Sequence, residues 1–288
     1  MSKLSIPPAW QGPLPEATPP SDVAVYQLPT GTYETRAVFA FKGGSFRDER
    51  PFAATAILVK HPKGDLLIDA GFGSDVAAHV HAQPWFARAP FQATGTAREQ
   101  LDASGYDPGR LRGVLITHSH WDHVSGLDQL RVPIWTNADE LQYAAEAHDG
   151  KVFRTVSAGH EIHRYGFDNT PYLGFPSSYD VYGDGSVVVA LAGGHTTGSV
   201  VVFVTLPTSK RYAFIGDLTW QLEGIRHLAE RPLLMRKLAD VDAGQVREGL
   251  LRVASLAGLM QVVPSHDLTA YDGIPRLSVR QDLPADAA

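Results

Sequence analysis

The stretch from residue 117 to residue 127 constrains the fold more than any other part of the chain. Within six positions it carries four side chains that can bind a metal: His118, His120, Asp122 and His123. An apolar run over residues 113–117 precedes them and predicts a short buried strand, and residues 124–130 after them predict the start of a helix. We therefore expect the four side chains at the carboxyl end of a strand, where sheet proteins tend to bind ligands.

The spacing of these four side chains predicts two cations. In a tight turn, His118 and His120 can direct their imidazoles to one point, while Asp122 and His123 face a second point nearby. Paired hydrolytic metals usually lie about 3.5 to 4 Å apart. The alternative is a histidine-rich loop that binds no metal. Of the 12 histidines in 288 residues, three lie within these six positions beside an aspartate, which disfavours coincidence.

Cysteine is absent from the chain, so thiolate ligands and disulfides are excluded. Histidine and carboxylate ligands suit Zn, Mn or Fe and do not choose among them. The chain has 25 basic and 31 acidic residues, a net charge of −6, and no basic run. A nucleic-acid partner is therefore not expected, since such binding needs a positive surface.

Targeting and membrane signals are not evident. The first 20 residues are rich in proline and lack the apolar core of a signal peptide. No apolar run approaches 18 residues, so no membrane span is expected. These features predict a cytoplasmic location.

The motif around His118 resembles that of the metallo-β-lactamase-fold superfamily of metal hydrolases, and further motifs of that family follow in order. Residues 66–71 match the strand that carries a supporting aspartate, here Asp69. Residues 193–199 match the family's Gly-His-Thr-x-Gly-Ser loop with His195, residues 214–217 match the strand ending in the bridging aspartate, Asp217, and residues 262–267 carry the last ligand, His266. The resemblance extends over roughly residues 36–268.

The resemblance implies an α/β fold, namely a four-layer αββα sandwich with two mixed β-sheets and flanking helices. No Pro/Gly/Ser linker divides the middle of the chain, so we expect residues 23–288 to form one catalytic domain. Residues 1–22 are expected to be an extended N-terminal arm. The arm would pack across the domain, contact a second copy in a homodimer, or remain a loose tail.

The resemblance also implies roles for the site residues. Two divalent cations, Zn²⁺ first and Mn or Fe as alternatives, would be held by His118, His120 and His195 on one side and by Asp122, His123 and His266 on the other, with Asp217 bridging. A hydroxide between the cations would attack a carbonyl, because bound metal lowers the pKa of water to near 7. Asp122 would also pass a proton to the leaving oxygen. Asp69 would orient a ligand histidine.

Among subfamilies, this motif set looks most like the quorum-quenching lactonases, which open acyl-homoserine lactones. Those enzymes commonly carry a tyrosine three residues after the bridging aspartate, where this chain has Trp220. An indole N–H can donate a hydrogen bond but cannot act as acid or base. Trp85, Phe86 and Phe91 are expected either in the core or as an apolar wall of the substrate pocket. The expected partner is thus a small-molecule lactone or ester with an apolar part.

One other function stays open, and two functions of other classes are disfavoured. A phosphodiester or organophosphate hydrolase could use the same site. A flavodiiron-type oxidoreductase would need a glutamate in the motif, and the position holds His120. A non-catalytic metal-binding module would be expected to have lost ligands, and all seven are present.

Local patterns predict the remaining elements and place the other histidines outside the site. Strands are expected over residues 23–28, 35–41 and 53–60, with a turn at 29–31, and helices after Asn137 and over residues 224–240 and 243–259. Residues 150–186 are expected to be irregular. His61 is expected in a solvated turn, and the pair His79 and His81 lacks a following carboxylate. His160 and His163 are expected at the surface, with a place in the site as the alternative.

Overall fold

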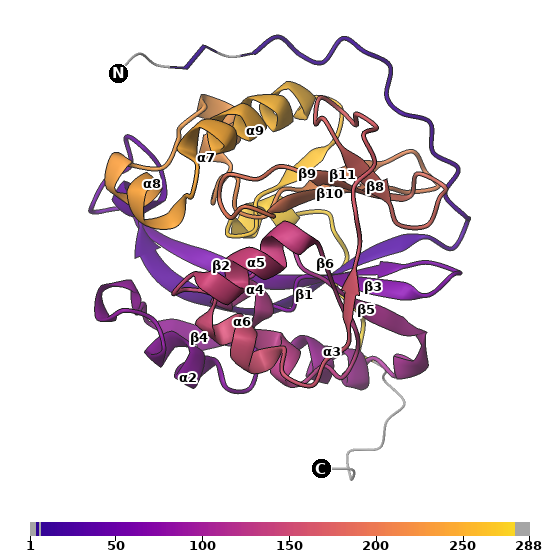
Figure 1. The fold of residues 1–288 in the computed structure, drawn as a ribbon, viewed down its shortest axis with the longest axis horizontal. Coiled ribbons are helices and arrows are strands. Elements are labelled where there is room, and N and C mark those ends of the chain that lie inside the picture. The colour runs from indigo at the N-terminus through magenta and orange to yellow at the C-terminus, as the bar shows by residue number, and fades with distance from the viewer. Residues whose placement is uncertain (1–3, 6, 280–288) are drawn as a thin grey trace.

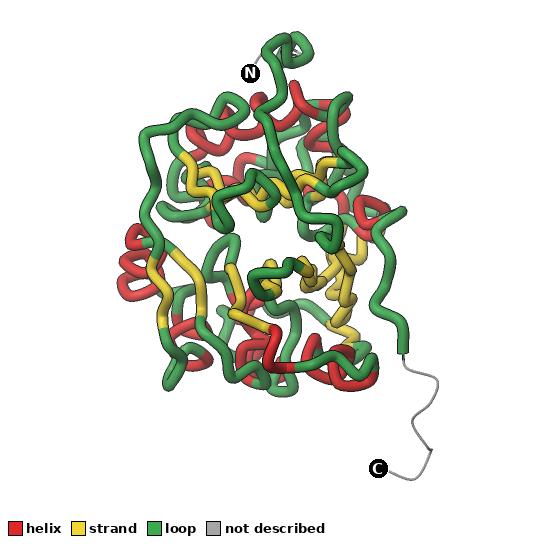
Figure 2. The backbone as a smooth tube through the Cα atoms, turned by 90° about the vertical axis from the view of Figure 1, so that its right-hand side faces the viewer, coloured by secondary structure: helices red, strands yellow, loops and turns green. Residues whose placement is uncertain are grey.

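Two β-sheets lie face to face between outer layers of helices in the computed structural model, which describes residues 4–5 and 7–279 (Figures 1 and 2). The first sheet has the order β4-β1-β2-β3-β5-β6-β7. Its strands are β1 (Ala24–Arg36), β2 (Glu49–Lys60), β3 (Asp65–Ile68), β4 (Phe91–Ala93), β5 (Leu111–Leu115), β6 (Ile134–Thr136) and β7 (Ile162–Arg164). Strands β3, β5, β6 and β7 run parallel and the other pairs are antiparallel, so this sheet is mixed.

The second sheet has the order β12-β11-β10-β9-β8. Its strands are β8 (Ser178–Asp180), β9 (Val187–Leu191), β10 (Val200–Thr205), β11 (Arg211–Phe214) and β12 (Gln261–Val263). Strand β12 is parallel to β11, and the other pairs are antiparallel. The two mixed sheets with flanking helices that the resemblance implied are thereby confirmed.

The helices are short and lie mainly on the outer faces of the sheets. They are α1 (Ala37–Ala40), α2 (Val76–His81), α3 (Ala97–Ala103), α4 (Trp121–Val124), α5 (Ala138–Glu146), α6 (Lys151–Val156), α7 (Glu223–His227), α8 (Leu233–Ala239) and α9 (Ala243–Leu256). In Figure 1, α7 and α9 cover the five-stranded sheet, while α2, α3 and α6 lie on the side of the seven-stranded sheet. Within the described residues, no helix combines the length and apolarity needed to cross a membrane.

The apolar strands bury both faces because successive side chains point in opposite directions. On β2, Ile57 and Val59 pack into the core between the sheets, and Leu58 packs outward beneath the helices. On β10, Val202 faces the core between the sheets and Phe203 packs outward under α9. This arrangement explains why the strands read as continuous apolar runs.

The N-terminal arm runs along the five-stranded sheet side (Figure 1) and forms neither helix nor strand in its described residues. Trp10 donates its backbone N–H to the carbonyl of Ser255 at 3.0 Å, and Thr18 donates to the carbonyl of Asp184 at 2.8 Å. Leu4, Trp10 and Leu14 pack against the apolar cluster around α9. The domain boundary at residue 22 stays a prediction.

The turn expected at residues 29–31 and the separate strand expected at 35–41 are wrong. Strand β1 continues through Pro29 with a bulge between Pro29 and Gly31, which absorbs the missing N–H of the proline. A side chain at Gly31 would lie 2.4 Å from the carbonyl of Gln92, so the close approach of β4 requires glycine there. Strand β1 ends at Arg36, and α1 occupies residues 37–40.

The single helix expected over residues 224–240 is two helices. Leu228 adopts the left-handed conformation (φ 48°), which ends α7. Pro232 is extended and directly precedes α8, and a proline is disfavoured inside a helix. Residues 150–186, expected to be irregular, contain α6, β7 and β8. The short apolar run in α6 was hidden among the polar residues that surround it.

Candidate metal centre

The histidine-rich motif of residues 117–127 follows the end of β5, as predicted. Residues 116–120 connect the strand to α4, which begins at Trp121, and His120 just before the helix is extended. The side chains of His118 and His123 are buried, and their rings lie 4.0 Å apart. The ring of His120 lies 4.7 Å from that of His118. The strand end and the first turn of α4 together turn these rings inward.

Three further segments carry side chains to the same place. His195 lies in the loop between β9 and β10, Asp217 follows β11, and His266 follows β12. The turn before His195 needs glycine, because Gly194 has φ 88° and an added side chain would lie 2.6 Å from the backbone nitrogen of Val246. These three side chains are buried.

The seven side chains form two adjoining groups. The candidate ligand atoms within each group all lie within 4.8 Å of one another. One group comprises His118, His120, His195 and Asp217, and the other comprises Asp122, His123 and His266. The side chains that the sequence analysis assigned to two cations are thus brought together by the fold.

Asp217 lies between the two groups and presents one oxygen to each. Its Oδ1 atom lies 3.1 Å from Nε2 of His266 and 3.3 Å from Nε2 of His123. Its Oδ2 atom lies 3.4 Å from Nε2 of His195 and 3.9 Å from Nε2 of His118. This geometry suits a carboxylate that bridges two cations.

Each histidine is oriented through its second ring nitrogen. Partners at that nitrogen are Asp69 for His123 (2.8 Å), Asp240 for His195 (3.1 Å), the carbonyl of Ala53 for His266 (2.8 Å), Asp149 for His120 (3.0 Å) and Thr117 for His118 (3.1 Å). Such partners fix which nitrogen points inward, as is usual for metal-binding histidines. Asp69 therefore lies where a supporting aspartate was expected.

Several inward-facing atoms are buried without a hydrogen-bond partner. They are Nε2 of His118, His123 and His266 and Oδ1 of Asp217. A buried polar atom without a partner costs about 1–3 kcal/mol. Nitrogen and carboxylate oxygen donors of this kind are what Zn²⁺, Mn²⁺ or Fe²⁺ bind, so the residues fit a pair of divalent cations.

The charges around the centre also favour cations. Burial by itself lowers the pKa of His123, but Asp69 and Asp217 outweigh burial and hold that pKa well above its ordinary value. Burial raises the pKa of Asp217, yet His266 and His123 outweigh it and hold that pKa well below its usual range. The carboxylates thus create a negative potential at the point where the imidazoles meet.

Sequence reasoning missed Glu140, which ties the two ligand loops together. Its carboxylate is buried and accepts hydrogen bonds from the backbone N–H and the hydroxyl of Ser119, at 2.6 and 2.5 Å, and from the hydroxyl of Thr196 at 2.5 Å. Asn137 caps α5 as predicted and donates to the carbonyl of Gly198 at 2.7 Å. The sequence signal at Glu140 was only that of an acidic residue in a first helical turn.

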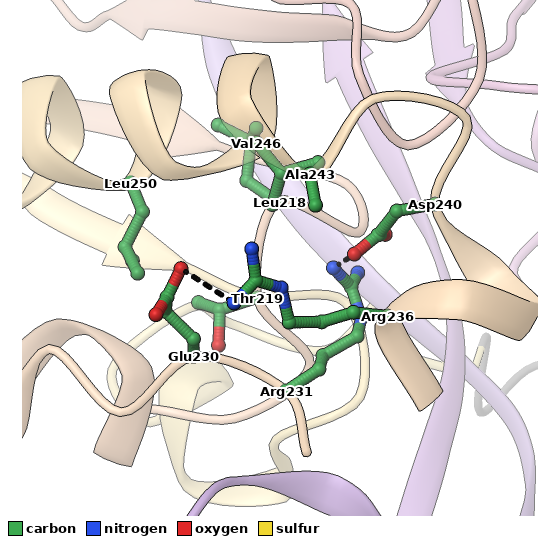
Figure 3. A pocket seen from close by; sticks show the side chains of 9 residues that line it. All are labelled: Leu218, Thr219, Glu230, Arg231, Arg236, Asp240, Ala243, Val246 and Leu250. Atoms are coloured by element: carbon green, nitrogen blue, oxygen red, sulfur yellow. Dashed lines mark hydrogen bonds and ion pairs between the residues drawn. The ribbon is translucent and has the colours of Figure 1, made fainter. Parts of the chain in front are cut away.

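Arg231 was also missed, and it supports the centre from the α7–α8 connection. It donates to Oδ1 of Asp240 at 2.8 Å and to the carbonyl of Asp217, and its guanidinium lies 4.5 Å from the Trp220 ring centroid. Figure 3 shows Arg231 and Arg236 between Glu230 and Asp240. These side chains line a small cavity, whose volume is about 10 Å³. No local sequence pattern distinguishes this arginine from a surface one.

The four aromatic residues considered as substrate contacts do not all lie at the centre. The indole N–H of Trp220 donates to Oδ2 of Asp217 at 2.7 Å, so it is committed to the centre. Phe91 packs on Phe72, whose ring stacks on Trp121. Trp85 is 79% exposed, which rules out the core position considered for it. The side chain of Phe86 lies outside the described part of the structure.

The remaining histidines lie outside the centre, but His61 is not solvated as expected. Its ring is buried, stacks 3.7 Å from Tyr182 and lies 3.0 Å from Asp184, because the turn between β8 and β9 covers it. His79 is buried against Ser125 at 2.7 Å, and His81 is exposed. His160 contacts backbone carbonyls, and His163 stacks on Trp135.

The chain is similar in sequence to a known family and to individual known proteins. The profile of the metallo-beta-lactamase superfamily matches residues 50–266. The N-acyl homoserine lactonase AttM of Rhizobium johnstonii is 26% identical over 267 residues, covering 87% of this chain and 95% of that protein. A probable metallo-hydrolase of Mycobacterium tuberculosis is 26% identical over 234 residues, covering 75% of this chain and 74% of that protein.

Solved structures share the fold. An N-acyl homoserine lactone hydrolase with the product N-hexanoyl-L-homoserine at its catalytic metal centre matches with a TM-score of 0.67 and 16% identity, covering 85% of this chain and 94% of that chain. The dizinc quorum-quenching lactonase AidC matches with a TM-score of 0.57 and 15% identity, covering 88% of this chain and 90% of that chain.

Proposed function

The chain belongs to the metallo-beta-lactamase superfamily, and on that premise we propose that it is a dinuclear metal-dependent hydrolase of lactones or esters with an apolar part. The observation that carries this proposal is the convergence of five imidazoles and two carboxylates from four separate strand ends, with inward-facing atoms that lack partners. A structural core would bury apolar side chains here, because unpartnered polar atoms are costly.

Each metal would have its own ligand set in this proposal. His118, His120 and His195 would hold the first cation, Asp122, His123 and His266 would hold the second, and Asp217 would serve both. The two oxygens of Asp217 support this division, since each faces a different set. Zn²⁺ is the metal we propose first, because the similar lactonase AidC is a dizinc enzyme; Mn or Fe, which the same donors suit, are the alternatives.

Divalent cations bound there would supply Lewis acidity and make hydroxide available near neutral pH. The chain's own residues perform the remaining tasks. Asp122 passes a proton to the leaving oxygen, a task for which a carboxylate in the second set is placed; its Oδ2 atom lies 3.4 Å from Nε2 of His266. Asp69 keeps His123 in the orientation that directs Nε2 inward.

The preference for an apolar lactone or ester rests on the walls of the centre. Phe52 stacks on His266 with ring centroids 5.0 Å apart. Tyr33 lies 5.5 Å from His266, and the ring of Trp121 is tilted against that of Tyr33 at 5.6 Å. The net charge of −6 disfavours an anionic phosphodiester. The lactonase names among the relatives agree with this preference.

A hydrolysis screen with metal-reconstituted protein tests the substrate class. We expect the best lactone or aryl ester with an apolar tail to exceed bis(nitrophenyl) phosphate in kcat/KM by at least about 10-fold, because an apolar wall adds binding energy for the tail. The panel should also contain β-lactams and short-chain esters as matched comparisons. If bis(nitrophenyl) phosphate were hydrolysed faster than every lactone and ester, the phosphodiesterase alternative would replace this proposal.

A further inference from the structure

A tyrosine from β1, far from the ligand motifs in sequence, reaches the rim of the metal centre. The hydroxyl of Tyr33 donates to Oδ2 of Asp122 at 2.9 Å. In the β1–β2 register Tyr33 lies opposite Phe52, beside Ala53, whose carbonyl accepts from Nδ1 of His266. The β1–β2 pair therefore brings a phenol to the side of the centre formed by Asp122 and His266.

Rings on several sides hold Tyr33 in this position. Its ring centroid lies 5.3 Å from Phe52, 6.4 Å from Phe72, 5.6 Å from Trp121 and 5.5 Å from His266. The ring of a tyrosine has only two side-chain torsions, and this packing fixes both. The residue as a whole is half-buried, and its hydroxyl faces Asp122.

The residue at which the lactonase resemblance places a phenol cannot supply one in this chain. Position 220 is tryptophan, its indole N–H already donates to Asp217 at 2.7 Å, and Arg231 covers its face at 4.5 Å. A second phenol, that of Tyr143, donates to Asp149 at 2.8 Å on the opposite side of His120. Tyr33 is thus the phenol that faces the carboxylate proposed to handle the proton.

Resting on the proposed function, we propose that Tyr33 is a catalytic residue whose hydroxyl donates a hydrogen bond to the leaving alcohol oxygen of the substrate. An oxygen that receives a proton from Asp122 must approach that carboxylate to about 2.6–3.2 Å. This requirement places the leaving oxygen beside the phenol, which already lies at hydrogen-bond distance from Asp122.

The step balances without a proton from the tyrosine. Water adds its oxygen to the acyl carbon, the bond from that carbon to the alcohol oxygen breaks, and the electron pair stays on the alcohol oxygen. The proton that Asp122 delivers originates in the attacking water. The single O–H of Tyr33 turns from Asp122 to the leaving oxygen as Asp122 takes up the proton of the attacking water. Tyr33 thus keeps its own proton and stabilises the negative charge that builds on the leaving oxygen through a hydrogen bond.

Tyr33→Phe tests this role, because it removes the hydroxyl and keeps the ring. For substrates with an alkyl alcohol leaving group we expect kcat/KM to fall on the order of 10- to 100-fold, the range for one hydrogen bond to a charged group. For nitrophenyl esters of the same acid the fall in kcat/KM should be less than about threefold, since the weakly basic nitrophenolate oxygen leaves without a hydrogen-bond donor. Metal content should equal that of the wild type.

The control is Tyr179→Phe on β8, whose ring stacks on Tyr165 at 5.1 Å outside the centre, and it should leave both rates unchanged. An equal loss for both leaving groups, or a loss that follows reduced metal content, would mean that Tyr33 only positions Asp122 and would overturn the proposal. Unchanged rates in Tyr33→Phe would overturn it as well. Absence of lactone or ester hydrolysis by the wild type would remove the proposed function itself, and this role with it.

Discussion

Asp217→Ala should abolish hydrolysis, with a loss greater than about 100-fold. Substituting groups that only orient metal ligands costs about 10–100-fold, and Asp217 faces both ligand sets directly. The same loss is expected for His120→Ala, since Nδ1 of His120 lies 2.9 Å from Nε2 of His195. Initial rates on the best lactone or ester, measured at saturating added metal, give the result.

A matched histidine substitution separates this effect from general damage. His81→Ala on α2 removes an exposed imidazole and should retain full activity. Circular dichroism should show the wild-type spectrum for all three variants, because the two sheets pack through apolar side chains away from the centre. Full activity in Asp217→Ala or His120→Ala would contradict the proposed mechanism.

Removal of metal by a chelator should both stop hydrolysis and lower the melting temperature. A ligand present at about 1,000 times its Kd stabilises the folded state by about 4 kcal/mol per site. For a chain of this size we expect a decrease in melting temperature of at least several degrees. The physical reason is that unpartnered buried atoms of His118, His123, His266 and Asp217 then face one another without a cation.

The control for chelation is Asp217→Ala, whose melting temperature is measured with and without chelator beside that of the wild type. That variant should melt at nearly the same temperature with and without chelator, because it is expected to hold fewer than one cation per chain that the chelator could remove. Activity of the wild type should return when Zn²⁺ or Mn²⁺ is added back. A wild type that hydrolyses its substrate equally well after exhaustive chelation would refute a metal-dependent reaction.

The sequence indicated the centre well because its ligands follow a simple rule of position. Apolar runs end at residues 116, 191, 215 and 263, and a histidine or aspartate follows each within a few residues. Since the strand ends of two stacked sheets meet at one edge, such residues converge without any detail of packing. His195 and His266 could be assigned in this way although they lie 71 residues apart in sequence (266 − 195).

The supporting residues could not be found in the same way. Tyr33, Glu140 and Arg231 reach the centre through register and packing between distant elements, and each looks locally like an ordinary strand, helix or loop residue. Register in particular depends on the bulge at Pro29, which sequence reasoning treated as a turn. His61 was assigned to solvent because the β8–β9 turn that covers it is more than 100 residues away.

The role of Trp220, which replaces the tyrosine of the lactonase motif, could be assigned only from the structure. From the sequence it was a substituted substrate contact. In the structure its N–H is committed to Asp217, and Tyr33 supplies a phenol from another strand. The comparison of Tyr33→Phe across leaving groups therefore also tests how this chain accommodates tryptophan at position 220.

Seven side chains between His118 and His266 are proposed to hold a pair of divalent cations. Elemental analysis of the purified wild-type protein, after reconstitution and removal of free metal, measures this directly. We predict about two metal ions per chain, as expected for a paired hydrolytic site, and fewer than one in Asp217→Ala. A wild type that retains only trace metal under these conditions would contradict it.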